Sequence, residues 1–346
     1  MGEQAVREVF AAQAEACERL GSPFTAALCA GLGERLGEGK VAGAVLGWPG
    51  DPSIAADSVP LRLCGALHAL VLSGRDGALA ATYPPRAGRP DMGAVLAALD
   101  AHAPFVLDWL RSPPQTNETA RAAAVWPMLS LVAARTGLPL ALFEVGASAG
   151  LNLRMDRFGY ALGSAANGDM GSALQLAPEW RGAPAPDARV CVAAREGCDL
   201  APLDPTAPSD ALRLRAYLWP DQPARLQRLD AALAIARAVP APVARADAVD
   251  WIAERVTAPR EGTVRVLYST VAWQYLPDER RAEGERLIAA TAAAATPDAP
   301  FAWARMENDG DGEGAGLRLL LAPHGVDALV GRAHFHGAWV HWRGIG

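Results

Sequence analysis

The chain has 346 residues, 51% of them hydrophobic, so it can bury a large core, and its length permits either several domains or one large domain with an appendage. Its formal net charge of −6 does not support a surface for the phosphate backbone of nucleic acids. The five cysteines include no Cys-x-x-Cys pair, which indicates neither a disulfide framework nor a zinc site.

Residues 1–20 alternate charges with short apolar groups, and the sequence contains no run of 18 uncharged apolar residues. Signal peptides and transmembrane helices need a longer uninterrupted apolar segment. We therefore expect a cytoplasmic protein with reduced thiols, no export signal and no membrane span. Nothing in the sequence indicates the oligomeric state.

Residues 1–137 are predicted to form an N-terminal all-helical domain, because Ala, Leu and Val recur at helical spacing. Ser22-Pro23 has the form of a helix N-cap followed by proline at the first helical position. Gly137, followed by Pro139, indicates that the last helix ends there. No strand is predicted before Pro139.

From residue 138 to 346 the sequence alternates between strand and helix candidates, which favours a mostly parallel sheet covered by helices. The predicted strands are 140–145, 189–193, 243–246, 264–270 and 302–306. The predicted helices are 149–156, 210–218, 222–238, 248–255 and 278–295.

Two later strand-like runs, 317–321 and 333–342, are joined by a region that contains Pro and Gly, and they predict an antiparallel C-terminal hairpin at the sheet edge. The Pro-, Gly- and Ala-rich stretch 159–187 is predicted to be an insertion. The expected fold class is therefore α/β, with a Rossmann-like sheet following the helical domain.

The segment 144–150, Glu-Val-Gly-Ala-Ser-Ala-Gly, leads from the first predicted strand into a helix, and α/β proteins bind ligands at such turns. A dinucleotide-binding turn needs glycine where this chain has Ser148 and Leu151. The segment also spells the Gly-x-Ser-x-Gly nucleophile elbow of serine hydrolases around Ser148. That elbow follows several strands of its sheet, whereas the preceding residues are predicted to be helical. The histidines available downstream are His324, His334, His336 and His341.

A methyltransferase that uses S-adenosylmethionine needs a glycine-rich turn after the first strand, with an acid at the strand end. Glu144, Gly146, Ser148 and Gly150 match this pattern. Glycine permits the turn and a close approach of backbone to ligand, and a carboxylate can accept hydrogen bonds from the cofactor amine. We predict that these four residues, with Asn152, bind the cofactor.

Five sequence blocks make the chain resemble an uncharacterised bacterial family, domain of unknown function 2332. The blocks are LHALVLSG at 67–74, YPP at 83–85, QTNE at 115–118 with Arg121, EVGASAGLNL at 144–153 with DRFxY at 156–160, and LRAYLWPDQ at 214–222. The family implies no activity. A looser likeness to class I S-adenosylmethionine-dependent methyltransferases implies the cofactor.

That likeness also implies two further cofactor-binding acids. In such folds an acid at the end of the second strand holds the ribose hydroxyls and an acid after the third lies near adenine, which points to Asp199 and Asp247. The spacing from Glu144 to Asp199 exceeds the ~20 residues typical of a dinucleotide fold, and the insertion at 159–187 accounts for the excess. The alternative for each acid is a helix N-cap or turn.

Polar and aromatic residues outside the turn are candidates for substrate contact. Gln115, Asn117 and Glu118 precede a predicted helix, and capping explains only part of this polar block. Trp273 and Tyr275 follow the fourth predicted strand, where packing under the next helix is the alternative.

The acidic segment 307–313 lacks the EF-hand spacing, and we expect only Glu307 to face the ligand. His334 and His336 are predicted to share one face of a strand, but no nearby carboxylate or cysteine completes a metal site. No metal is predicted.

These features predict an S-adenosylmethionine-dependent methyltransferase acting on a small molecule or protein group, with no nucleic-acid or membrane partner. The helical domain is expected to cover the substrate side. Methyl transfer can rely on holding donor and acceptor in near-attack geometry, so the lack of an obvious catalytic base is not decisive. The alternatives are a serine hydrolase using Ser148 and a non-catalytic nucleotide-binding protein of the same fold.

Overall fold

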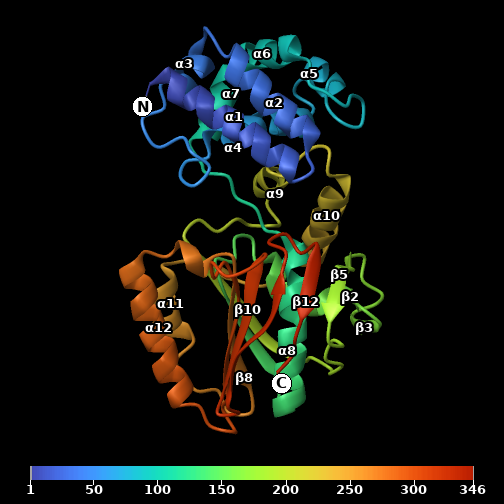
Figure 1. Cartoon of the computed structure of the whole chain (residues 1–346), viewed down its shortest axis with the longest axis vertical. Helices are drawn as coiled ribbons and strands as arrows, with labels where there is room; N and C mark the ends of the chain where they lie inside the picture. The colour runs from blue at the N-terminus through green and yellow to red at the C-terminus, as the bar shows by residue number, and fades with distance from the viewer. Residues whose placement is uncertain (1, 346) are drawn as a thin grey trace. The chain divides into compact units, whose positions relative to one another are not determined.

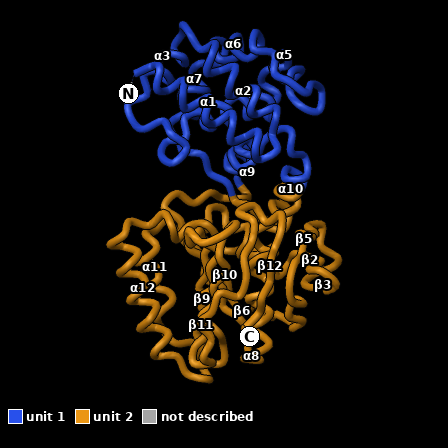
Figure 2. The backbone as a smooth tube through the Cα atoms, viewed as in Figure 1, with its two compact units in different colours: residues 1–116, 207–227 blue, residues 117–206, 228–346 orange. Residues whose placement is uncertain are grey.

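The computed structural model describes residues 2–345, which divide into two compact units (Figure 2). One unit contains the residues up to 116 together with 207–227, and the other contains 117–206 and the residues from 228 onwards. This division differs from the expected boundary at 137/138, because helix α8 (Ala122–Thr136) belongs to the second unit. The helix is buried from Ala122 to Ala133 except at the half-buried Leu131, as expected for a stretch that is apolar on nearly every side.

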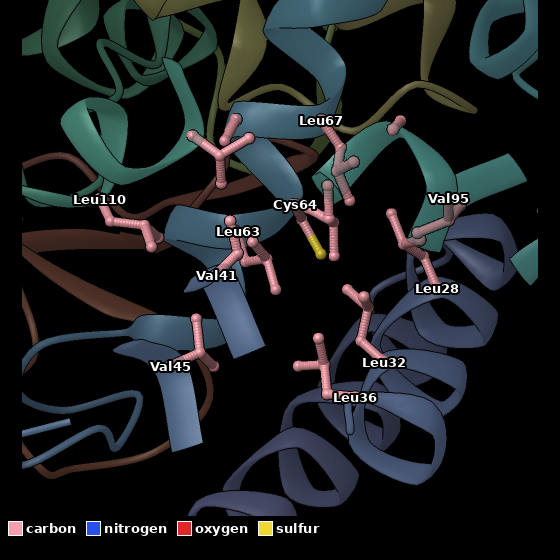
Figure 3. Packing of buried hydrophobic residues seen from close by; sticks show 14 of the residues in the cluster. Leu28, Leu32, Leu36, Val41, Val45, Leu63, Cys64, Leu67, Val95 and Leu110 are labelled. Carbon is pink, nitrogen blue, oxygen red and sulfur yellow. The ribbon is translucent and has the colours of Figure 1, made fainter. Parts of the chain in front are cut away.

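The first unit is helical throughout its described residues. Its helices are α1 (Glu3–Arg19), α2 (Pro23–Arg35), α3 (Lys40–Leu46), α4 (Val59–Leu72), α5 (Gly77–Ala81), α6 (Met92–Ala101), α7 (Ala103–Leu110) and α9 (Pro208–Ala216). Figure 3 shows part of its core, in which Leu63, Cys64 and Leu67 of α4 pack among leucines and valines of the neighbouring helices. Ser22 caps α2 as predicted, since its side chain accepts the Thr25 N–H.

The second unit contains a nine-stranded sheet in the order β5-β12-β11-β10-β9-β8-β1-β6-β7. The strands are β1 (Leu140–Val145), β5 (Glu179–Gly182), β6 (Val192–Asp199), β7 (Val243–Arg245), β8 (Val264–Thr270), β9 (Phe301–Glu307), β10 (Ala315–Ala322), β11 (Val326–Ala333) and β12 (Trp339–Trp342). Strands β7, β6, β1, β8 and β9 are parallel neighbours, and β9 to β12 are joined by antiparallel pairings. The predicted α/β class with a mostly parallel sheet and a helical part is confirmed.

Helices cover both faces of this sheet. Figure 1 shows α11 (Ala248–Arg255) and α12 (Asp278–Ala293) on one side and α8 on the other. Strands β1 and β8 are buried along their whole length, as expected for central parallel strands covered on both faces, although β8 includes the polar residues Arg265, Ser269 and Thr270. Phe143 and Leu267 belong to the core under α11 and α12, together with Trp251 and Ile288 of those helices.

The stretch predicted as an insertion forms a small sheet of β2 (Gly159–Leu162), β3 (Ala165–Gly168) and β4 (Gln175–Leu176), followed by β5. β5 pairs in parallel with β12 at the edge of the main sheet. Helix α10 (Pro223–Ala238) begins in the first unit and continues in the second.

Three predicted elements needed correction. The strand expected at 189–193 is β6, which ends six residues later at Asp199, because the charges of Arg195 and Glu196 find partners on neighbouring elements. The helix expected at 149–156 is a 3-10 helix, η2 (Leu151–Arg157), because positive φ angles delay its start. The run expected at 333–342 is interrupted at 334–338, and the preceding strand β11 was not predicted.

No single helix within residues 2–345 is long and apolar enough to cross a membrane. All five cysteines are free thiols; Cys191 is exposed and the other four are buried.

Candidate functional site

The C-terminal ends of β1 and β8 are the position where a sheet of this topology binds ligands. After β1 the chain adds β6 and β7 on one side, and it then returns to add β8 and β9 on the other. Open α/β sheets bind ligands at such a topological switch point, outside the carboxyl ends of the strands. Glu144 and the turn 146–150 lie there, so the structure brings the predicted cofactor turn to the expected edge.

The turn 146–150 takes its shape from three residues with positive φ, Gly146 (+68°), Ser148 (+53°) and Gly150 (+65°). Packing also excludes a side chain at both glycines. A Cβ at Gly146 would lie 2.4 Å from Cβ of Ala272, and one at Gly150 would lie 2.8 Å from Cγ2 of Val243. Contacts within the protein therefore favour glycine at both positions, whether or not a ligand binds there.

Two polar side chains hold this turn by accepting its backbone N–H groups. The Ser148 N–H donates to the carboxylate of Asp199, and the Leu151 N–H donates to Oδ1 of Asn117, each at 2.8 Å. Asp199 ends β6 and also accepts the Ala201 N–H at 2.9 Å. Asp199 and Asn117, both predicted to contact a ligand, thus stabilise the turn through hydrogen bonds. Their side-chain oxygens can still accept further hydrogen bonds.

Glu144 is a buried acid without a direct ion pair among the described residues. Its carboxylate accepts a hydrogen bond from the Tyr268 hydroxyl of the neighbouring strand β8 at 3.2 Å. Burial raises the pKa of Glu144 to about 8, although the Tyr268 hydrogen bond and the charges of Arg154 and Arg121 act in the opposite direction. At neutral pH most of this carboxyl is therefore protonated, and a nearby ligand cation favours its ionisation.

Two buried polar atoms beside the turn have no hydrogen-bond partner among the described residues. They are Oγ of Ser148 and Oδ1 of Asn152. The amide nitrogen of Asn152 donates to the Glu118 backbone oxygen at 3.3 Å, which leaves its oxygen as a free acceptor. Buried polar atoms are normally satisfied, so these two require a ligand or a water to complete them.

The polar segment around Asn117 belongs to the same edge of the sheet. Glu118 is buried and accepts the Ala120 N–H at 3.1 Å, with Arg228 3.9 Å away. Arg121 donates to the backbone oxygens of Thr270 and Phe335, both at 2.9 Å, and so ties η1 (Thr119–Arg121) to the end of β8. Gln115 belongs to the first unit.

Asp247 has the role of a helix cap. Its carboxylate accepts the N–H groups of Val249 and Asp250 at the start of α11 and also bonds Arg280. Burial raises the pKa of Asp247, but the bond with Arg280 and the two N–H groups lower it further, so the pKa is below its usual value. The residue lies two positions beyond β7, where the methyltransferase likeness expects an acid.

Glu307, at the end of β9, is largely buried and pins the turn that follows β8. It accepts hydrogen bonds from the Ser269 hydroxyl at 2.7 Å and from the N–H groups of Ala272 and Trp273 at 3.1 Å each. Burial raises its pKa despite these bonds. The turn includes Val271 at a φ of +55°, a costly conformation for a β-branched residue, which Glu307 helps to stabilise.

Substituting Glu307 by alanine is expected to lower the free energy of unfolding by about 2–4 kcal/mol, because several buried donors lose their acceptor together. Urea unfolding followed by tryptophan fluorescence measures this loss. Glu254→Ala, at an exposed position of α11, is the matched control. Equal unfolding midpoints for the two variants would contradict the assigned role.

The two aromatic candidates after β8 differ in their surroundings. Trp273 is buried against Trp303, with ring centroids 5.5 Å apart, and against Gly284 of α12. Packing under the next helix accounts for it. Tyr275 is 72% exposed and lies at the end of η3 (Trp273–Tyr275).

The sequence did not predict a site role for Tyr268, Arg154 or Arg121. All three lower the pKa of Glu144, and Arg121 also bonds the end of β8. Tyr268 carried no distinctive signal, because its strand also contains Arg265, Ser269 and Thr270. Arg154 lay within a segment that was predicted to be an ordinary helix. Its guanidinium is buried and donates to the Gly150 and Val239 backbone oxygens.

His334 and His336 lie in the turn between β11 and β12, not on one strand face as predicted, and the His336 N–H donates to Nδ1 of His334 at 3.1 Å. Across the described part of the chain, no three His, Cys, Asp or Glu side chains are grouped so as to hold a metal ion.

The fold and the turn define a mixed α/β protein with a candidate ligand site at the switch point of its sheet. The family described as "Uncharacterized protein conserved in bacteria (DUF2332)" matches residues 7–342, and the chain belongs to this family. No curated protein and no solved structure gives a significant match.

Proposed function

We propose that this protein is an S-adenosylmethionine-dependent methyltransferase with an unidentified small-molecule or protein acceptor. The observation that carries the proposal is the buried acid Glu144 beside a Gly-x-Ser-x-Gly turn at the switch point of the sheet. Acids near the ends of the two strands that follow β1 on one side of the main sheet, Asp199 at β6 and Asp247 after β7, give additional support.

The residues present have the donors and acceptors that such a ligand requires. Ionised Glu144 would accept hydrogen bonds from the α-ammonium group, and Asp199 would accept them from the ribose hydroxyls. Ser148 Oγ and Asn152 Oδ1 are unpartnered beside them. Asp247 is the least available, because a helix cap and Arg280 already occupy its carboxylate.

S-adenosylmethionine supplies a sulfonium methyl group for in-line displacement. The chain contributes a rigid turn, held by Asp199 and Asn117, which orients donor and acceptor. The hydrogen-bonded turn of η3, held by Glu307, fixes the adjacent end of β8.

Calorimetric titration with S-adenosylmethionine and S-adenosylhomocysteine tests this proposal. We expect wild-type binding and a loss of at least about tenfold in affinity for Glu144→Gln and for Asp199→Asn, the factor for one charge-assisted hydrogen bond. Asp187→Asn, at an exposed position in the same unit, is the control. Absence of wild-type binding would remove the cofactor assignment.

Proton release gives a second readout of the same site. Because burial raises the pKa of Glu144 to about 8, binding of an ammonium group near pH 7 must ionise this carboxyl and release a proton. Titrations in buffers with different ionisation enthalpies measure the release. Wild type should release protons, whereas Glu144→Gln should not; equal release by both would place the ligand elsewhere.

The hydrolase alternative requires a base on Ser148 Oγ, and this atom has no hydrogen-bond partner among the described residues. Loss of ester hydrolysis in Ser148→Ala would favour that alternative. Cofactor binding without turnover on a broad acceptor panel would favour the non-catalytic alternative.

A further inference from the structure

A cavity of about 350 Å³ lies between α12 and strands β9 and β10. This volume is within the range of small-molecule sites. Arg305 of β9 and Arg318 of β10 line it, together with Trp273, Glu285 and Glu307.

Arg305 and Arg318 are direct cross-strand partners in the antiparallel β9–β10 pair. Their side chains therefore leave the same face of the sheet, and like charges in this arrangement destabilise a sheet. Neither arginine forms an ion pair with a carboxylate among residues 2–345, and Nε of Arg305 is buried without a hydrogen-bond partner. The pair therefore has no carboxylate at ion-pair distance, although Glu285, Asp327 and Glu307 act on Arg305 from further away.

The position of Arg305 is held by an aromatic ring. Its guanidinium carbon lies 3.7 Å from the ring centroid of Trp303, two residues earlier on the strand. Stacking of this kind fixes the guanidinium plane while leaving its N–H groups available. Burial and the charge of Arg318 lower the pKa of Arg305, and these effects exceed the opposite effect of the carboxylates of Glu285, Asp327 and Glu307.

Among residues 2–345, the acids that line the cavity form no ion pair with either arginine. Glu307 is occupied by the Ser269 hydroxyl and backbone N–H groups, and Asp309 is bonded by both terminal nitrogens of Arg332 at 3.1 and 2.7 Å. Glu285 is exposed on α12.

We propose that this cavity binds the oxyanion group of a small molecule, a phosphate or a carboxylate, between Arg305 and Arg318. Guanidinium groups bind both kinds of oxyanion through paired N–H donors. The bound anion supplies the direct acceptor that neither arginine finds on a carboxylate of the described residues, including Nε of Arg305. The proposal is independent of cofactor binding at the β1–β8 edge.

The test is calorimetric titration and thermal unfolding with inorganic phosphate and with citrate, each compared with chloride at constant ionic strength. Wild type should bind at least one of the two anions, and the stronger one identifies the group. Arg318→Met should weaken binding at least about tenfold, the factor for losing one charge-assisted hydrogen bond. Arg286→Met, at an exposed position of α12 outside the cavity lining, should bind as wild type does.

Arg318→Glu adds a second test of the position of the site. It places a carboxylate across from Arg305, which can accept from the guanidinium in place of an external anion, so the thermal unfolding of this variant should no longer respond to phosphate or citrate. The proposal is overturned if neither anion binds wild type, if Arg318→Met binds as tightly as wild type, or if either anion stabilises Arg318→Glu as much as wild type.

Discussion

Replacing Glu144 by glutamine is expected to stabilise the protein by about 3 kcal/mol at pH 7. Burial raises the pKa of Glu144 to about 8, whereas the ordinary pKa of a glutamate side chain is 4.5. Between these values the folded protein binds more protons than the unfolded chain, so the contribution to stability is full below about pH 4.5 and is lost as the pH rises to about 8. Glutamine has no charge to desolvate, and its oxygen can still accept the Tyr268 hydroxyl hydrogen bond.

Chemical denaturation across this pH range measures the effect. The unfolding free energy of Glu144→Gln relative to wild type should increase steadily as the pH is raised, and Glu261→Gln, at an exposed position, should show no such trend. A difference that does not change with pH would mean that Glu144 is ionised in the folded protein throughout.

Gly146→Ala is expected to lower the free energy of unfolding by about 3–4 kcal/mol, combining overpacking with the cost of a left-handed conformation. The new Cβ would lie 2.4 Å from Cβ of Ala272, and the backbone at Gly146 has a φ of +68°. Variants at Gly146 therefore test folding and are unsuitable as tests of cofactor binding. Thermal or urea unfolding measures the loss.

A compensating substitution separates the two causes. Gly146→Ala combined with Ala272→Gly removes the clashing methyl group, so the double variant should recover part of the loss and keep a deficit of about 1–2 kcal/mol from the left-handed conformation. Ala272→Gly alone is the control for the added glycine. If the double variant is no more stable than Gly146→Ala, the contact with Ala272 is not the cause.

The sequence predicted the two central strands with their observed bounds. β1 is apolar except for Glu144, and β8 is rich in β-branched and aromatic residues, which favour strands although Arg265 and Ser269 interrupt the run. Helix α11 agrees because Asp247 marks its start as an N-cap. The bounds predicted for β6 were wrong because the charged residues Arg195 and Glu196 are untypical of a strand in a covered sheet. Their partners, Asp156 and Arg255, come from distant segments of the chain.

The candidate site was predicted in the same uneven way. The turn at 146–150 and Asn117 were identified because glycine and clustered polar residues are visible in one sequence. The electrostatic surroundings of Glu144 were not, because Tyr268 is 124 residues away and approaches it only through the β1–β8 pairing. The Arg305–Arg318 pair also depends on strand register, which one sequence does not specify.

By itself, the sequence determined the α/β class, the helical N-terminal region and the position of the acid–glycine turn, because these follow from local hydrophobic period and turn chemistry. Only the tertiary structure decided which side chains have partners. In the structure Glu307 stabilises the turn after β8, and Asp247 caps helix α11. Glu144 is buried and has no direct ion pair among the described residues. The surroundings of these three carboxylates depend on burial and on pairing between distant segments, and neither can be predicted from a short stretch of sequence.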